Sequence, residues 1–234
     1  MITTILFDLD GTLLPMDQEV FVKEYLGRMA KKLAPQGYDP DLLVKGIWKG
    51  TGAMVKNDGS KSNEEVFWSV FNAVMGKDCQ KDEELFLEYY RNEFQEVRHA
   101  CGFDSRAAQA ISEIKSMGYR IALATNPLFP AIATQSRAAW AGLNIDDFEI
   151  ITTYENSRHC KPNPDYYRDI LATLDVKPEN CLMVGNDVSE DMIARDLGMK
   201  VFLLTDSLIN KENKDLGEYP HGSFEELMTF IREL

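Results

Sequence analysis

The chain has 234 residues, of which 38 are acidic and 25 basic, so its formal charge at pH 7 is −13. This charge argues against nucleic acids and anionic membranes as partners. No stretch has the length and apolarity of a bilayer span, and the first residues lack the basic lead of a signal peptide. The four cysteines show no metal-ligand spacing, so we expect free thiols in a protein of the reducing cytoplasm.

The first predicted element is a strand at residues 2–7, a short apolar run rich in β-forming residues. From residue 15 to residue 96 we find only helical patterns, in which apolar residues recur at helical spacing. One shorter helix is expected to open at Asp39-Pro40 and to end near Gly50. We interpret residues 15–96 as an inserted helical domain, because such apolar stripes usually form a core.

From residue 97 onward, strands and helices alternate. Apolar runs predict strands at residues 119–124, 148–152, 181–184 and 200–204. Between them lie predicted helices, one of which stops at Gly118 while another starts at Asn163-Pro164. The polar stretch 206–222 is interpreted as a surface loop. Strand alternating with helix predicts an α/β protein with a parallel sheet covered on both faces.

Polar residues follow three of the predicted strands. Ligands of an open parallel sheet bind outside the carboxyl ends of its strands, so we expect these residues to gather at one rim. Asp191 follows Asp187 by four residues, and the two carboxylates would share one face if a helix begins there. The candidate site consists of Asp8, Asp10, Thr125, Asn126, Lys161, Asp187 and Asp191.

Carboxylates packed this closely need a balancing charge, and a hard divalent cation with oxygen ligands supplies it. We expect Mg²⁺, with Asp8 and Asp187 as direct ligands. Asp10 would offer its backbone carbonyl, and Asp191 would bind directly or through water. With the cation offsetting charge, Asp8 can attack a phosphate as a nucleophile and form an aspartyl-phosphate.

The remaining candidates have supporting roles in the same chemistry. Asp10 would protonate the leaving oxygen and later activate water, which needs a pKa nearer neutrality than that of a free carboxyl group. Thr125, with Asn126 beside it, would bind the transferring phosphoryl group. Lys161 would neutralise charge on that group.

The motifs that carry these residues resemble the four ordered motifs of the haloacid dehalogenase superfamily. They are Asp8-Leu9-Asp10-Gly11-Thr12, Thr125-Asn126, Lys161-Pro162 and Gly185-Asn186-Asp187 with Asp191. The resemblance implies a Rossmann-like core at residues 1–14 and 97–234, Mg²⁺, and the nucleophile and acid/base roles given above. It also implies that residues 15–96 are an α-helical cap that selects the substrate. Many relatives have Gly-Asp where this chain has Gly-Asn-Asp, which leaves open whether Asp187 or a shifted partner holds the metal.

The function that we expect is hydrolysis of a small phosphorylated metabolite. A phosphotransferase or sugar-phosphate mutase would use the same residues and remains the main alternative. A 2-haloacid dehalogenase is a further alternative, which Asp10 disfavours because dehalogenating members generally lack an aspartate there. A binding module without turnover is disfavoured by the intact set of carboxylates and lysine. Neither the substrate nor the oligomeric state is indicated by the sequence.

Overall fold

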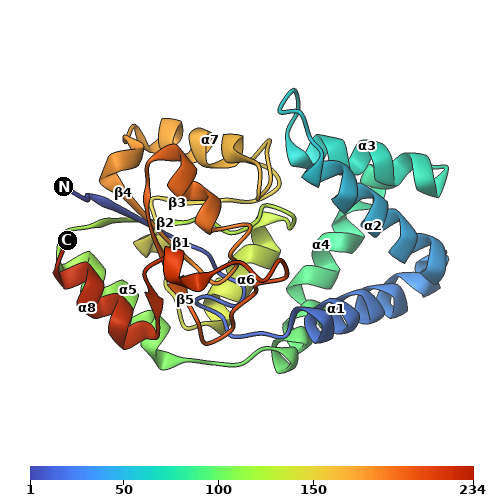
Figure 1. Cartoon of the computed structure of the whole chain (residues 1–234). Helices are drawn as coiled ribbons and strands as arrows, with labels where there is room; N and C mark the ends of the chain where they lie inside the picture. The colour runs from blue at the N-terminus through green and yellow to red at the C-terminus, as the bar shows by residue number, and fades with distance from the viewer.

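The computed structural model describes all 234 residues and contains one six-stranded sheet with helices on both faces (Figure 1). The strands are β1 (Thr4–Phe7), β2 (Arg120–Leu123), β3 (Ile150–Ile151), β4 (Cys181–Gly185), β5 (Lys200–Leu204) and β6 (His221–Gly222). Their order is β3-β2-β1-β4-β5-β6, and every neighbouring pair is parallel. The predicted α/β class with a parallel sheet is confirmed.

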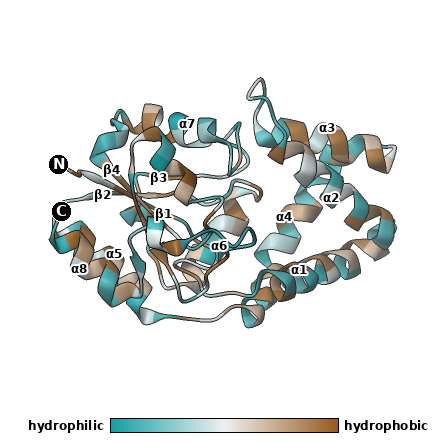
Figure 2. Ribbon diagram, viewed as in Figure 1, coloured by the Kyte–Doolittle hydropathy of each residue, from teal (hydrophilic) through white to brown (hydrophobic).

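The central strand β1 is buried on both faces of the sheet. Ile5 and Phe7 point into the largest hydrophobic cluster, whereas Leu6, between them, points into the second largest, on the other face of the sheet. Side chains alternate along a strand, so a strand covered on both sides needs apolar residues at every position. Figure 2 shows that the central strands are mainly hydrophobic, whereas the surrounding helices carry both hydrophobic and hydrophilic residues.

Four α-helices cover the sheet. They are α5 (Ser105–Ser116), α6 (Ala131–Trp140), α7 (Pro164–Leu174) and α8 (Phe224–Arg232). Helices α5, α6 and α8 contribute to the larger cluster, whereas α7 packs on the opposite face. The predicted helix stop at Gly118 is confirmed by its φ of 90°, and the predicted start is confirmed by the Asn163 side chain, which accepts a hydrogen bond from the Asp165 N–H.

The chain between β1 and β2 is helical, as predicted, and we call residues 18–100 the helical segment. It contains α1 (Gln18–Leu33), α2 (Pro40–Val55), α3 (Asn63–Met75) and α4 (Glu83–Arg91), with 3₁₀ turns that include η3 (Glu93–Ala100). The helical segment lies to one side of the sheet (Figure 1). None of the helices combines the length and the apolarity that a bilayer span requires.

The predicted end of α2 near Gly50 is wrong, because the helix continues to Val55. Gly50 is buried against α3, and a Cβ atom there would lie 2.6 Å from the ring of Phe67. Gly46, one turn earlier, has the same relation to Phe71, with a separation of 2.9 Å. These glycines therefore permit the close approach of two helices and do not end one.

Two other expectations differ from the structure. Residues 187–191 form a turn followed by the 3₁₀ helix η6 (Met192–Leu197), so no helix begins at Asp187 and the condition for a shared helix face of Asp187 and Asp191 is not met. The stretch 206–222 is not loop throughout, because it contains η7 (Leu216–Glu218) and the whole of the edge strand β6. A strand of two residues has too few positions to show an alternating pattern.

The two connections of the helical segment to the sheet run side by side. Met16 and Cys101 form an antiparallel bridge, and the Gly102 N–H donates to the Pro15 carbonyl at 2.7 Å. A second contact joins the start of α3 to the loop that precedes α7, where the Asn63 N–H donates to the Ser157 carbonyl at 2.8 Å. The helical segment thus contacts the sheet domain at two places, namely beside its two connecting strands of chain and at the loop that leads to Lys161.

Candidate active site

The carboxyl ends of β1, β2 and β4 are adjacent because these strands are neighbours in the sheet. Asp8 follows β1 directly, Thr125 follows β2 by two residues, and Asn186 follows β4 directly. Backbone bonds from the Asp8 N–H to the Val184 carbonyl and from the Ala124 N–H to the Phe7 carbonyl extend the pairing past the strand ends. The backbone that carries Asp8, Thr125 and Asn186 is therefore held in place by hydrogen bonds between neighbouring strands.

Lys161 links two of the predicted carboxylates. Its Nζ lies 2.8 Å from Asp8 Oδ1 and 2.7 Å from Asp191 Oδ1, and all three residues are buried. Burial by itself would lower the pKa of Lys161, but the Asp191 and Asp8 carboxylates reverse that effect and raise it well above its usual value. Lys161 is therefore a fixed cation that is held between two acids.

The loop after β1 brings its own hydroxyl to the nucleophile candidate. Thr12 Oγ1 lies 3.1 Å from Asp8 Oδ2 and 2.9 Å from Asn186 Oδ1, so it bridges the ends of β1 and β4. Gly11 has a φ of 88°, and a Cβ atom there would lie 2.3 Å from the Asn186 amide nitrogen. Only glycine fits this position, for both its backbone and its space.

Asp10 is bound to a buried arginine that the sequence did not indicate. Its carboxylate forms an ion pair with Arg137 of α6, a side chain that is 1% exposed. Arg137 Cζ also lies 4.3 Å from the centre of the Phe129 ring. Burial raises the pKa of Asp10, the charge of Arg137 opposes this, and the charge of Asp8 adds to it.

Thr125 and Asn126 lie beside this group, as predicted. The buried Thr125 uses its carbonyl to accept from the Thr152 hydroxyl at 2.6 Å and the Tyr166 hydroxyl at 2.9 Å. The Asn126 side chain accepts from the Lys161 N–H at 3.2 Å. The second motif therefore supports the backbone of the lysine loop.

A sequence profile of the haloacid dehalogenase-like hydrolase family matches residues 2–198. The chain belongs to this family. The predicted family resemblance is thereby confirmed, and so is the expectation that the chain is an enzyme.

Three proteins that resemble this hydrolase have low sequence identity to it. The pyrophosphatase PpaX of Bacillus cereus (strain Q1) is 24% identical over 200 residues, which cover 85% of this chain and 81% of PpaX. A HAD phosphatase from Thermococcus onnurineus is 21% identical, with a TM-score of 0.59 and 98% of each chain covered. A 2-haloacid dehalogenase from Pseudomonas syringae pv. Tomato DC3000 is 18% identical, with a TM-score of 0.64. The match covers 100% of this chain and 99% of the dehalogenase. The two solved structures carry different activities, so their likeness shows the fold alone.

The fourth motif of this hydrolase folds as a turn. Asp187 Oδ1 accepts from the N–H groups of Ser189 and Glu190, at 2.7 and 2.9 Å, and Asp191 Oδ2 accepts from the Asp187 N–H at 2.9 Å. The Asp191 carboxylate thus points back under the turn towards Lys161. One oxygen of Asp187 is occupied by the backbone, whereas the other accepts no hydrogen bond from the protein.

Glu190 is a second residue of the site, after Arg137, that the sequence did not indicate. Its Oε2 accepts from the Asn126 side-chain amide at 3.0 Å. Burial raises the pKa of Glu190 to about 7, the charge of Lys161 opposes this, and the charges of Asp191 and Asp187 add to it. In the sequence Glu190 stands in a polar run, where nothing separates it from a solvated glutamate.

Most of the predicted residues line one cavity of about 740 Å³, open mouth included. Its lining includes Asp8, Asp10, Thr125, Asn126, Asp187 and Asp191, together with side chains of α1. Lys161 lies behind this wall and reaches it through Asp8 and Asp191. The volume suits a small molecule.

The donor atoms in this cavity are of the kind that Mg²⁺ prefers, namely carboxylate and backbone oxygens. Asp8, Asp187 and Asp191 offer them on one wall. No three acidic, histidine or cysteine side chains lie close enough together to form a ready-made metal cluster. The fit to Mg²⁺ therefore rests on the chemistry of these oxygen donors.

Proposed function

We propose that this enzyme hydrolyses small phosphate monoesters with the Asp8 carboxylate as nucleophile. The observation that carries the proposal is the buried contact of 2.8 Å between Lys161 Nζ and Asp8 Oδ1 at the end of the central strand. A buried ammonium beside the nucleophile offsets the repulsion between a carboxylate and a phosphate dianion. The relatives named as phosphatases support a phosphate group as the substrate's reacting part.

In the first step an Asp8 oxygen attacks phosphorus while the bond from phosphorus to the ester oxygen breaks. The leaving oxygen takes a proton from the Asp10 carboxyl group, whose pKa is raised by burial. Asp10 then removes a proton from water, which attacks the aspartyl-phosphate and releases inorganic phosphate. Arg137 holds Asp10 at the cavity wall throughout.

We propose Mg²⁺ as the cofactor, bound by the carboxylates of Asp8 and Asp187 and the backbone carbonyl of Asp10. Asp191 would contribute directly or through water. When bound, the cation would offset negative charge on the phosphate. Lys161 remains the internal cation of the site, and Thr125 and Asn126 would contact the phosphoryl group.

Residues 15–96, which include most of the helical segment, would act as a cap over this cavity, and residues 1–14 with 97–234 would form the core. Phe21 and Val22 of α1 line the cavity from the side of the helical segment. Asn63, at the start of α3, reaches the core through its side-chain amide, which lies 3.3 Å from the Pro127 carbonyl and 3.3 Å from Cys160 Sγ. With these contacts formed, the cap would cover the catalytic residues and keep bulk water from the aspartyl-phosphate.

Two alternatives use the same fold. A 2-haloacid dehalogenase releases a halide, which needs no proton, so the role of Asp10 as the acid for the leaving group would serve no purpose there. A phosphotransferase or mutase would pass the phosphoryl group to a hydroxyl of the substrate. Phosphate release, halide release from a 2-haloacid, and isomer formation on hexose phosphates separate the three.

The test is release of inorganic phosphate from p-nitrophenyl phosphate and a panel of small esters, with Mg²⁺ or with EDTA. Pyrophosphate belongs in the panel because the curated relatives are pyrophosphatases. The Asp8→Asn variant should lose turnover, whereas Asp196→Asn, at an exposed position, should retain it. Turnover that survives Asp8→Asn in folded protein would refute the proposed nucleophile.

A further inference from the structure

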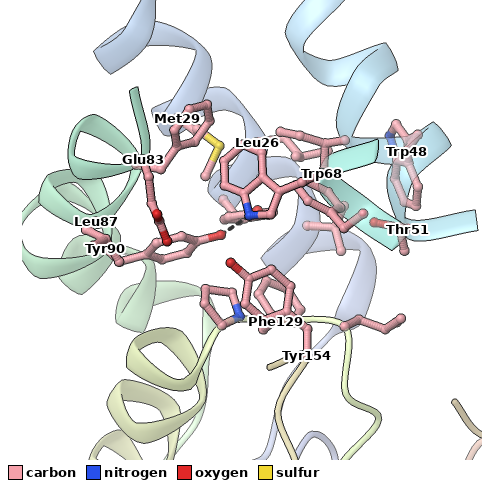
Figure 3. Close-up of a pocket in the computed structure, with 17 residues that line it drawn as sticks. Leu26, Met29, Trp48, Thr51, Trp68, Glu83, Leu87, Tyr90, Phe129 and Tyr154 are labelled. Atoms are coloured by element: carbon pink, nitrogen blue, oxygen red, sulfur yellow. Dashed lines mark hydrogen bonds between the residues drawn. The ribbon is translucent and has the colours of Figure 1, made fainter. Parts of the chain in front are cut away.

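A second cavity lies between the helical segment and the sheet domain (Figure 3). Its volume is about 910 Å³ with the open mouth included, and 14 of its 17 lining residues are hydrophobic. Figure 3 shows Glu83, Leu87 and Tyr90 of α4 on one side, with Trp48 and Thr51 of α2 on the other. We call it the apolar cavity, and the cavity that contains Asp8 the catalytic cavity.

The two cavities share a wall. Val22 of α1 and the neighbouring residues Leu128 and Phe129 line both. The shared wall lies on the side of Asp10, because Arg137 binds the Asp10 carboxylate and also lies over the Phe129 ring. The side of the catalytic cavity that would hold the leaving group therefore borders the apolar cavity.

The charges of the apolar cavity limit what can enter it. Glu83 is the only charged residue in the lining, which contains no lysine, arginine or histidine. A second phosphate or a carboxylate would be desolvated there beside a carboxylate, without a cation to pair with. Trp68 Nε1 is a buried donor that lies near the Tyr154 hydroxyl but makes no hydrogen bond of normal geometry.

We propose that the apolar cavity binds the alcohol part of the substrate, and that the preferred substrates are phosphate monoesters of aryl or arylalkyl alcohols. Aromatic walls favour a flat ring. A hydrogen-bond acceptor on that ring would pair with Trp68 Nε1. The inference rests on the proposed phosphatase activity and specifies its substrate class.

The first experiment compares kcat/KM for 1-naphthyl phosphate and for glycerol 2-phosphate with Mg²⁺ present. Burial of the naphthyl ring should favour the aryl ester by about 10-fold, and because naphtholate is also the better leaving group, the contribution of the cavity is the part of the preference that Thr51→Phe removes. Equal values for the two esters would overturn the inference while leaving the phosphatase activity established.

Filling the apolar cavity should remove that preference. Thr51 lines the cavity, and its neighbour Gly52 points into open space, where a Cβ atom would meet nothing within 4 Å. Thr51→Phe should lower kcat/KM for the naphthyl ester about 10-fold and change the glycerol ester by less than about 2-fold. Gly52→Phe, the matched control, should leave both esters unchanged. An equal loss on both esters in Thr51→Phe would count against the inference.

A charge reversal tests the exclusion of anions. Glu83→Lys should raise the kcat/KM ratio of pyrophosphate to naphthyl phosphate by about 10-fold, because a second phosphate would then meet a cation. Glu88→Lys, on the same helix but outside the lining, controls for the change of net charge. The same shift in both variants would mean that long-range charge, and not the cavity, sets the preference.

Binding without turnover separates the inference from the proposed function. Benzylphosphonate and methylphosphonate cannot be hydrolysed, and calorimetry should give benzylphosphonate about 10-fold tighter binding, lost in Thr51→Phe. If benzylphosphonate binds tighter but no ester is hydrolysed, the assignment of the apolar cavity is supported and the proposed phosphatase activity is refuted. If methylphosphonate binds equally well, the apolar cavity is not the site of the alcohol.

Discussion

The catalytic cavity and the apolar cavity share a wall but are held together by different forces. In the catalytic cavity, Asp8, Lys161 and Asp191 are buried charges that satisfy one another. In the apolar cavity, aromatic rings pack on each other, as where the ring centres of Tyr25 and Phe129 lie 5.3 Å apart. The first arrangement tolerates almost no change of residue type, whereas the second tolerates changes that keep volume.

The supporting elements differ in the same way. The charged residues stand on short loops at the ends of paired strands, so the backbone fixes them to each other. The apolar lining comes mostly from helices α1 to α4, which have few backbone bonds to the sheet domain. If the apolar cavity selects the alcohol, as we propose, substitutions in its lining can change that selection without moving the proposed catalytic residues.

The largest effect should follow from removing the cation of the catalytic cavity. Lys161→Met leaves Asp8 and Asp191 buried without their partner, which should cost about 3–5 kcal/mol of unfolding free energy and about 1000-fold or more in kcat. Urea denaturation and the phosphate-release assay measure the two. Lys56→Met, at an exposed position, is the control. A stable, active Lys161→Met variant would show that the two acids do not need the lysine.

Breaking the second ion pair should have a smaller effect. Arg137→Met leaves Asp10 without its partner but at the cavity wall, so we expect a loss of about 2 kcal/mol of unfolding free energy. Adding Asp10→Asn should recover part of that loss, because the unpaired charge is then gone. A double-variant cycle in urea measures the coupling. Additive losses would mean that Arg137 acts through packing on Phe129 alone.

The sheet beneath the catalytic cavity should be sensitive to high pH. Burial raises the pKa of Cys181 at the start of β4 to about 11, with Arg120 opposing this and Glu179 adding to it. The folded state therefore holds this proton more tightly than the unfolded state, so the stability it contributes is lost as pH rises from about 9 to 11. Cys181→Ala should reduce the loss over that range by about 1–2 kcal/mol. Parallel stability profiles of the two proteins would contradict the assignment.

The smallest effects on stability should come from substitutions in the helical segment. Two glycines of helix α2 should respond to the same substitution with changes of opposite sign. Gly50→Ala places a Cβ atom against the Phe67 ring and should destabilise by about 1–2 kcal/mol, despite the better helix propensity of alanine. Gly52→Ala faces open space and should stabilise by about 0.5–1 kcal/mol. Thermal unfolding compares them. The same sign for both would mean that α2 and α3 can separate at no cost.

Much of the fold could be read from the sequence because its signals are local. The run that forms β1 is apolar at every position, which a strand covered on both faces requires. Asn163 caps α7 and Gly118 follows α5 for reasons that act within a few residues. The predicted site residues on three strand ends meet because parallel neighbours place their carboxyl ends together. Their roles in metal and phosphate binding remain predictions.

Other features were invisible because their meaning depends on distant partners. Gly50 resembles a helix stop, yet Phe67 of α3 makes it a packing position. Arg137 has the appearance of a surface residue on α6, yet Asp10 from the first loop draws it into the interior. Glu190 becomes a perturbed acid only when the chain buries it beside Asn126.

The sequence by itself determined the alternation of strands and helices, the helical nature of the chain between about residues 15 and 96, and the acidic residues at the strand ends. These follow from periodicity, capping and the topology of a parallel sheet, which act over short spans. The tertiary structure alone decided which charges pair and where the apolar cavity lies. Both depend on residues that are far apart in the chain, such as Asp8 with Lys161 and Val22 with Phe129, and only packing brings them together.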